Sequence, residues 1–252
     1  MTDLESRCLA RPWFYSFRLA SGAVTSTYVS PEVAKIHDTR AAMLDAALDM
    51  HFGADAHGRK TAIDLACHEG WFAQQVARRG FDVLGVDARA EHVADATLAA
   101  QASGITNVRF RTADVHALLP GRDGRFDLVL CLGLLYHLEN PVGALRTARA
   151  LTADGGLCII ETQIAPGLSG MLDYGHHTFV KPMQGSFAIV DESDETHGPE
   201  TSTTGICLVP SLDALLWVLR KVGFTDVTVL EPPADAYEQL RYGKRVMVSA
   251  RA

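Results

Sequence analysis

Three aspartates follow short apolar runs and are placed where they could hold the polar groups of one ligand. Asp64 lies in "AIDLACHEG", Asp87 ends "DVLGVD", and Asp114 lies in "RTADVHAL". Because the carboxyl ends of parallel strands meet along one edge of an open α/β sheet, acids at three strand ends would converge on one site. The carboxylate of Asp87 suits a ribose diol, and Asp114 with the backbone N–H of Val115 suits an adenine edge. The set predicts an adenosine site, although a lone aspartate of this kind is more often a helix cap or turn residue.

The turn after the first of these runs, "AIDLACHEGWFA", lacks most of the glycines that a dinucleotide site needs. A pyrophosphate requires close backbone approach and bare N–H groups at a helix start, which G-x-G-x-x-G supplies. Here Ala66 and His68 occupy such positions, and Gly70 stands at the start of the predicted helix. The turn therefore favours a cofactor without pyrophosphate. His68 either faces the acceptor from the cofactor loop or is a solvated turn side chain.

A second group of polar and aromatic side chains is a candidate acceptor site. Tyr174, His176 and His177 lie in a long segment with little periodicity, and they could line an acceptor pocket or bind a metal. Adjacent histidines in a strand point to opposite faces, and no second ligand set follows at a recognised spacing, so we expect no metal. Tyr28, near the N-terminus, belongs either to a flap over the site or to an arm packed on the sheet.

The elements that position these residues alternate between apolar strands and amphipathic helices. Ser30 and Pro31 start a predicted leading helix that runs to about Phe52. Strands are predicted at "TAIDLA", "DVLGVD", "VRFRT", "FDLVLCL" and "GLCIIET", and helices at about 71–79, 90–103 and 141–151, with a short helical turn near 115. Five strands with crossovers predict a parallel, doubly wound sheet.

The rest of the chain departs from this alternation. Residues 163–210 are rich in Gly, Pro, Ser, Thr and acids, and a loop of that length is typically a lid, a substrate segment or disordered. A helix follows from Ser211 to about Gly223, and then two strands with no helix between them, which predicts an antiparallel pair at the sheet edge. The expected organisation is an N-terminal arm and helix (1–58) that covers the site, and an α/β domain (59–252) with 163–210 as its substrate-side insertion.

Composition and charge narrow the class of protein. The chain has 252 residues, 48% of them hydrophobic and 21% charged, with a formal net charge of -7, which fits one globular unit and gives no general attraction to phosphate backbones. The five scattered cysteines predict reduced thiols, and no signal peptide or apolar run of about 18 residues is seen. We therefore expect a soluble cytoplasmic protein without a membrane partner; whether it forms a homodimer stays open.

The same motifs resemble class I S-adenosylmethionine-dependent methyltransferases. "AIDLACHEG" stands in place of the Asp-x-Gly-x-Gly-x-Gly signature of that family, and "TAD", "FDLVLCLGLLYHLENP" and "LTADGGLCIIET" follow in order. The resemblance implies a Rossmann-like α/β fold: seven mostly parallel strands with an antiparallel last strand. It also implies S-adenosylmethionine as cofactor and S-adenosylhomocysteine as product. The implied cofactor contacts are Asp64, Ala66, His68, Gly70, Asp87, Asp114, Val115 and Leu132.

A narrower resemblance joins "GLLYHLENP", "IIETQI" and "WFYSFRLASGAVTS" to the branch that contains the tRNA wobble-uridine carboxymethyltransferase and related small-molecule methyltransferases. In that enzyme a tyrosine of the matching Leu-Tyr-His segment helps to hold a carboxylated cofactor, and Tyr136 has that place here. The branch does not fix the substrate. The acidic net charge and the lack of a Lys/Arg-rich run favour a small molecule over tRNA.

Methyl transfer needs an aligned acceptor and, often, a base that removes its proton. His137 follows the fourth predicted strand, where it could act as that base or pack at a helix start and bond to backbone. The leading hypothesis is a methyltransferase acting on an oxygen or nitrogen of a small molecule, with His137 and Tyr136 as catalytic candidates. The alternatives are a tRNA-modifying (carboxy)methyltransferase and a non-catalytic cofactor-binding protein.

Overall fold

A computed structural model gives the structure of residues 2–53, 60–175, 177–192, 202 and 204–252, with residues 173, 174 and 177–180 described by their backbone alone. Its main sheet has seven strands in the order β10-β11-β5-β4-β1-β2-β3. The strands are β1 (Thr61–Leu65), β2 (Asp82–Asp87), β3 (Val108–Thr112), β4 (Phe126–Leu132), β5 (Thr152–Gln163), β10 (Thr225–Val229) and β11 (Arg245–Arg251). The first five strands pair in parallel, and β11 is antiparallel to both β5 and β10. The predicted seven-stranded Rossmann-like sheet is confirmed.

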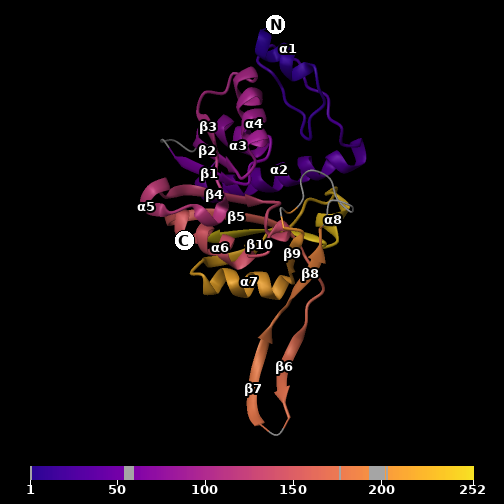
Figure 1. The fold of residues 1–252 in the computed structure, drawn as a ribbon, viewed down its shortest axis with the longest axis vertical. Coiled ribbons are helices and arrows are strands. Elements are labelled where there is room, and N and C mark those ends of the chain that lie inside the picture. The colour runs from indigo at the N-terminus through magenta and orange to yellow at the C-terminus, as the bar shows by residue number, and fades with distance from the viewer. Residues whose placement is uncertain (1, 54–59, 176, 193–201, 203) are drawn as a thin grey trace.

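Helices cover both faces of this sheet (Figure 1). They are α1 (Asp3–Leu9), α2 (Pro31–Phe52), α3 (Trp71–Arg78), α4 (Ala90–Ala102), α5 (Pro120–Asp123), α6 (Pro141–Leu151), α7 (Leu212–Lys221) and α8 (Glu238–Arg241), with short 3-10 turns η1 (Val115–Ala117) and η2 (Leu135–His137). Strand side chains alternate between two cores, one against α1 to α4 and one against α6 and α7. Within the described residues, none of these helices is both long and apolar enough to cross a membrane.

The last two strands differ in one detail from the expectation. The single-turn helix α8 lies between β10 and β11, where the sequence predicted no helix. Because one turn cannot carry the chain across a sheet, the strands still pair antiparallel. Strand β10 forms the sheet edge, and β11 lies one place inside it.

The segment 163–210 contains more regular structure than its composition indicated. Its described residues form two hairpins: β6 (Ser169–Tyr174) pairs with β7 (His177–Gln184), and β8 (Phe187–Asp191) pairs with β9 (Ile206–Pro210). The β6–β7 hairpin extends away from the body, whereas β8 and β9 lie against it (Figure 1). The sequence did not predict these strands, because the glycines and prolines of the segment disfavour strands locally. Strand pairing depends on cross-strand contacts, which local periodicity does not show.

The N-terminal arm packs onto the helix layer before α2 begins. Trp13 is fully buried, and its indole N–H donates to the carbonyl of Cys8. The amides of Phe14 and Tyr15 donate to the carboxylate of Glu69, at distances of 3.0–3.1 Å between N and Oε2. Glu69 lies in the turn after β1, so the arm is fastened directly to the predicted cofactor loop.

Candidate functional site

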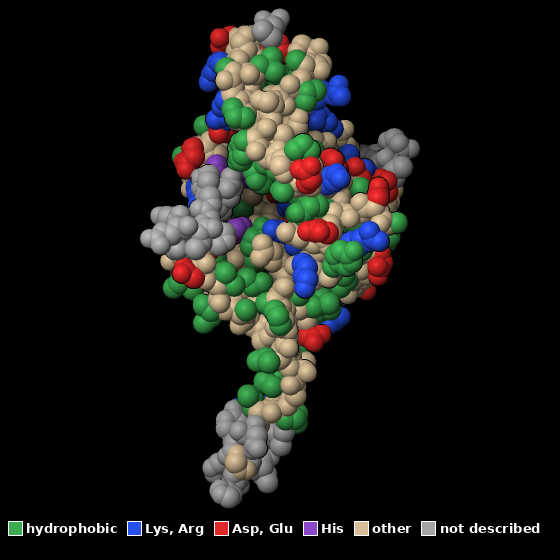
Figure 2. Space-filling model, turned by 90° about the vertical axis from the view of Figure 1, so that its right-hand side faces the viewer, with side chains coloured by type: hydrophobic (Ala, Val, Ile, Leu, Met, Phe, Trp, Pro, Cys, Tyr) green, Lys and Arg blue, Asp and Glu red, His purple; other side chains and the backbone are tan. Residues whose placement is uncertain are grey.

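A cavity of about 490 Å³ lies at the carboxyl ends of β1 to β4. Figure 2 shows a hollow on this face, with histidine side chains beside it. Eight of the predicted site residues line the cavity: Ala66 and His68 after β1, Asp87 at the end of β2, Asp114 and Val115 after β3, and Leu132, Tyr136 and His137 at and after β4. Its size and position are those of small-molecule sites in open α/β sheets.

The turn after β1 adopts a left-handed backbone without the glycines that usually supply it. Ala66 has φ of 59° and His68 has φ of 51°. A residue with a Cβ pays about 1–2 kcal/mol for this conformation, so the surrounding contacts must hold it. The amide of His68 donates to Oδ2 of Asp87 at 2.9 Å, and the amide of Cys67 donates to the carbonyl of Val86 at 2.9 Å. The neighbouring strand β2 therefore holds the turn in place.

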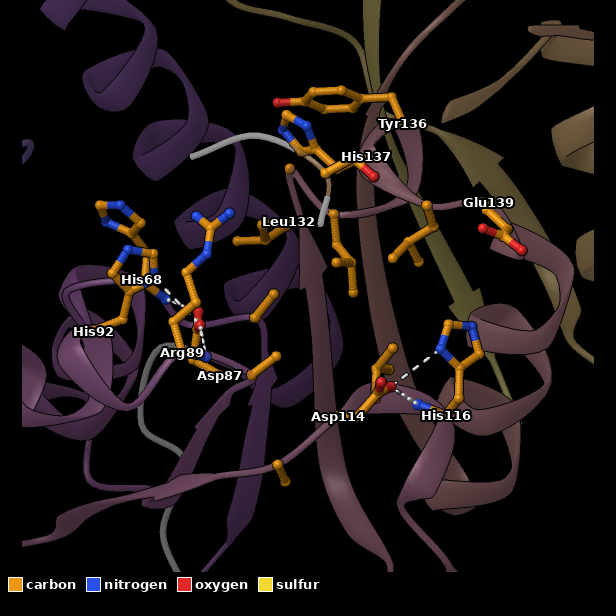
Figure 3. Close-up of a pocket in the computed structure, with 18 of the residues that line it drawn as sticks. His68, Asp87, Arg89, His92, Asp114, His116, Leu132, Tyr136, His137 and Glu139 are labelled. Atoms are coloured by element: carbon orange, nitrogen blue, oxygen red, sulfur yellow. Dashed lines mark hydrogen bonds and ion pairs between the residues drawn. The ribbon is translucent and has the colours of Figure 1, made fainter. Parts of the chain in front are cut away.

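Asp87 is the best supported acid of the site. Its Oδ1 accepts from the Arg89 amide at 3.0 Å and contacts Nδ1 of His92 at 3.1 Å, in addition to the bond from His68 (Figure 3). Burial alone would raise the pKa of Asp87, but these hydrogen bonds outweigh burial and hold the pKa below its usual value. The carboxylate is ionised at neutral pH. From the described residues, three contacts occupy this carboxylate, which has roughly four lone-pair positions, so one position is left for a ligand hydroxyl.

Asp114 lines the cavity but is bound within its own loop. Its Oδ1 accepts from the amide of His116 at 2.8 Å and contacts Nδ1 of the same ring at 3.1 Å (Figure 3). The second ring nitrogen of His116 lies 2.9 Å from the carbonyl of Asn140. The side chain of Asp114 is 64% exposed and caps the η1 turn. Val115, the next residue, is buried and also lines the cavity.

Two predicted cofactor residues, Asp64 and Gly70, do not line the cavity. Asp64 is buried, and burial raises its pKa to about 7, with Arg40 opposing the rise and Asp87 adding to it. Gly70 starts α3 with φ of 75°, and a Cβ there would lie 2.6 Å from the ring of Phe110. Gly70 is thus a close-packed position against Phe110, and Asp64 is a buried carboxyl; the contact of either residue with a cofactor stays a prediction.

Tyr136 belongs to a buried chain of charges that the sequence did not reveal. Its hydroxyl accepts from Arg245 at 2.9 Å, and the same guanidinium donates to Oε1 of Glu161 at 2.9 Å. Oε2 of Glu161 lies 3.1 Å from the guanidinium of Arg40, which lines the cavity. Burial raises the pKa of Tyr136, so its hydroxyl is neutral at pH 7. Two guanidinium groups therefore share one fully buried carboxylate at this end of the cavity.

His137 lies beside Tyr136, with 4.1 Å between the two ring centroids, at the far end of the view from Asp87 and Asp114 (Figure 3). Its Nδ1 is 2.6 Å from Oε2 of Glu192, which follows β8 in the insertion. Burial lowers the pKa of His137, and the contact with Glu192 offsets this in part. The imidazole is therefore neutral at pH 7 and able to accept a proton.

Of the remaining predicted residues, the structure describes the side chain of Tyr28 alone, and this residue does not line the cavity. Tyr28 is 55% exposed, and its ring lies 6.0 Å from that of Phe14. Phe14 and Tyr15, its neighbours in the arm, do line the cavity. His176 lies outside the described residues, and so do the side chains of Tyr174 and His177. Among described residues, no group of three or more His, Cys, Asp or Glu side chains could hold a metal ion.

Sequence reasoning missed Arg40, Arg245 and Glu192. Arg40 had a usable signal, since it lies four residues after Ile36 and four before Leu44 on the buried face of α2. A charged residue on an apolar helix face indicates a buried partner. Glu192 had no such signal, because it stands in the acidic run "DESDET", which is typical of a solvated loop.

Comparison of the sequence with known proteins gives matches to methyltransferases. A family model described as "Methyltransferase domain" matches residues 37–229. The ubiquinone biosynthesis O-methyltransferase of Psychrobacter cryohalolentis is 34% identical over 104 residues, which are 41% of this chain and 40% of that protein. The protein of the same name from Acinetobacter baylyi is 31% identical over 115 residues, 46% of this chain and 48% of that protein. The chain thus spans less than half the length of these curated relatives.

Solved structures match over a greater length. The N-terminal domain of EvdMO1, solved with S-adenosylhomocysteine bound, has a TM-score of 0.72 at 25% identity and covers 100% of this chain and 98% of that one. The 1,6-didemethyltoxoflavin-N1-methyltransferase of Burkholderia thailandensis has a TM-score of 0.53 at 20% identity, covering 87% and 84%. The second likeness supports the fold alone.

Proposed function

The chain belongs to the methyltransferase-domain family, as its strand-end motifs predicted, and on this premise we propose that it transfers a methyl group from S-adenosylmethionine to an oxygen or nitrogen of a small molecule. The observation that carries the proposal is that ionised Asp87 and the neutral imidazole of His137 line one cavity. Asp87 suits a ribose hydroxyl, and His137 suits a proton leaving the acceptor.

The residues present fit this cofactor. When bound, S-adenosylmethionine supplies a methyl group on a positively charged sulfur and leaves as S-adenosylhomocysteine. The turn at Ala66 and His68 has no glycine-rich loop to bind a pyrophosphate. S-adenosylmethionine contains no pyrophosphate, so it does not need such a loop. Asp87 keeps one acceptor position, and Arg40 gives the opposite end a positive charge that suits the carboxylate of an amino-acid group. The solved EvdMO1 domain with bound S-adenosylhomocysteine supports the same assignment.

The acceptor that fits best is a small molecule. The names of the curated relatives describe O-methylation in ubiquinone biosynthesis, which is methylation of a small molecule. The net charge of -7 opposes tRNA, whose phosphate backbone would need a basic surface. Ser202 and Thr204, in the insertion, also line the cavity and offer hydroxyl groups to a polar acceptor. We therefore assign the acceptor-binding role to the insertion.

Calorimetry and label transfer test this function. The wild-type protein should bind S-adenosylhomocysteine in a calorimetric titration and transfer labelled methyl groups from S-adenosylmethionine to members of a panel of phenols, sugars and amines. On the best acceptor, His137→Ala should lower turnover about 10²- to 10⁴-fold, because general base catalysis contributes that much. Its affinity for S-adenosylhomocysteine should stay within about threefold of wild type. A wild-type protein that does not bind S-adenosylhomocysteine would refute the proposal.

A further inference from the structure

The insertion places a carboxylate behind the imidazole that faces the cavity. Nδ1 of His137 lies 2.6 Å from Oε2 of Glu192, and the two residues are 55 positions apart in the chain. The side chain of Glu192 is 7% exposed and that of His137 is 22% exposed. A short contact between two largely buried polar groups from distant segments is a specific arrangement, because each group would lose hydration without the other.

Glu192 is itself fixed in place. Its Oε2 also accepts from the amide of Ser202 at 2.9 Å and from Sγ of Cys207 at 3.2 Å. Its backbone continues the pairing of β8 with β9, since the Glu192 amide donates to the carbonyl of Gly205 at 2.9 Å. The amide of Leu208 in β9 donates to the carbonyl of Leu138 at 3.0 Å, and this hydrogen bond joins β9 to the end of the η2 turn that contains His137. Hydrogen bonds therefore connect the carboxylate, strand β9 and the η2 turn that carries the imidazole.

The ionisation of Glu192 decides which nitrogen of His137 carries the hydrogen. Burial would raise the pKa of Glu192, but the hydrogen bonds from His137, Ser202 and Cys207 outweigh burial and keep it below the usual value. An ionised carboxylate can accept hydrogen bonds but cannot donate them. The hydrogen of the neutral ring must therefore be on Nδ1, and Nε2 is left as the basic nitrogen.

We propose that Glu192 is a positioning residue for methyl transfer, which holds His137 as the tautomer whose Nε2 accepts the proton of the acceptor. This inference rests on the function proposed above. In the step, the acceptor oxygen or nitrogen forms a bond to the methyl carbon while the carbon–sulfur bond breaks and its electron pair stays on sulfur. The acceptor proton passes to Nε2 and later to water. Glu192 stabilises the imidazolium that exists between these two proton transfers.

Nuclear magnetic resonance of the histidine ring nitrogens tests the proposal without an acceptor. With ¹⁵N-labelled histidine, the signals that disappear in His137→Gln identify His137. In the wild type, Nδ1 should carry the hydrogen and Nε2 should be unprotonated. In Glu192→Ala the Nδ1–H form should lose population, because its acceptor is gone. In Glu192→Gln the titration of His137 should move to lower pH, since removal of a negative charge disfavours the imidazolium. Arg245 and Arg89 also act on this ring and remain in every variant.

Turnover gives the second measurement. Glu192→Gln and Glu192→Ala should lower kcat at least about tenfold and leave the affinity for S-adenosylhomocysteine within about threefold, while Glu192→Asp should recover part of the loss. Asp191→Asn is the matched control, because it removes an exposed carboxylate at the end of β8, one residue before Glu192, and should leave both the tautomer and kcat near wild type. Thermal unfolding of each variant checks that it is folded.

The outcomes separate this inference from the function on which it rests. If the His137 signals are the same in the wild type and Glu192→Ala, or if they change and kcat does not, the positioning role is overturned. If the wild-type protein binds S-adenosylhomocysteine and methylates an acceptor, that failure concerns Glu192 alone. If the wild type binds no S-adenosylhomocysteine, the proposed function fails whatever the resonances show.

Discussion

The cavity has two walls that are built in different ways. The β1–β3 wall consists of Ala66, His68, Asp87, Asp114 and Val115, and the η2 wall consists of Tyr136 and His137 with their partners Arg245 and Glu192. In the β1–β3 wall, Asp114 binds an amide 2 residues away and Asp87 binds one 19 residues away. In the η2 wall, His137 contacts a residue 55 positions away and Tyr136 one 109 positions away.

This difference teaches how the two walls depend on the rest of the molecule. Backbone amides of neighbouring turns hold the carboxylates of the β1–β3 wall, and any sequence that forms these turns supplies such amides. Side chains from separate elements hold the η2 wall, and each is replaceable by mutation. We therefore expect single substitutions to disturb the η2 wall more than the β1–β3 wall, unless they remove a ligand contact directly.

The largest expected effect concerns the carboxylate that supports the η2 wall. Glu161→Ala removes the partner shared by Arg40 and Arg245 and leaves two buried guanidinium groups without it. Such a loss should lower the free energy of unfolding by about 3–5 kcal/mol, measured by urea denaturation. The matched control is Asp154→Ala, which breaks an exposed pair with Arg125 and should change stability little. Equal losses in the two variants would contradict the importance of the buried chain.

A smaller effect distinguishes two acids within the β1–β3 wall. Asp87→Asn should weaken binding of S-adenosylhomocysteine at least about tenfold, because a largely buried carboxylate with charge-assisted hydrogen bonds is lost. Asp114→Asn should weaken it less than about threefold, since this side chain is 64% exposed and asparagine keeps an acceptor for the His116 amide. Calorimetric titration measures both, and a similar loss for the two would show that Asp114 also contacts the ligand strongly.

The smallest effect tests the strain in the turn after β1. Ala66→Gly should raise the free energy of unfolding by about 0.5–1 kcal/mol, because relief of the left-handed conformation exceeds the entropy that glycine adds to the unfolded chain. Ala46→Gly, at an exposed position of α2, should instead lower it by about 1 kcal/mol. If both variants lose stability, the left-handed backbone at Ala66 is not strained.

The two walls also differ in how far the sequence predicts them. The strand-end acids and the turn with Ala66 and His68 were found because each belongs to a local strand–turn–helix pattern. Asp64 and Gly70 belong to the same pattern, yet the charge near Asp64 comes from Arg40 and the close packing at Gly70 comes from Phe110, which lie in other elements. His137 was found by its place after β4.

Glu192 was not found, because its neighbours in the chain are acidic and polar, and its burial arises from contacts with His137 and the β9 strand. The hairpins of the insertion were missed for the same reason. A sequence pattern within one segment predicts the secondary structure of that segment. A contact between distant segments can be recognised only once the fold is known.

The hydrogen bonds between Glu69 and the N-terminal arm help to define where the structural unit that forms the cavity begins. The family match starts at residue 37, within α2. Phe14 and Tyr15 lie before that point, yet their side chains line the cavity and their amides bind Glu69. A protein trimmed to the matched region would lose part of the ligand enclosure and the donors of this carboxylate. The structural boundary of the binding unit therefore precedes the boundary drawn by similarity.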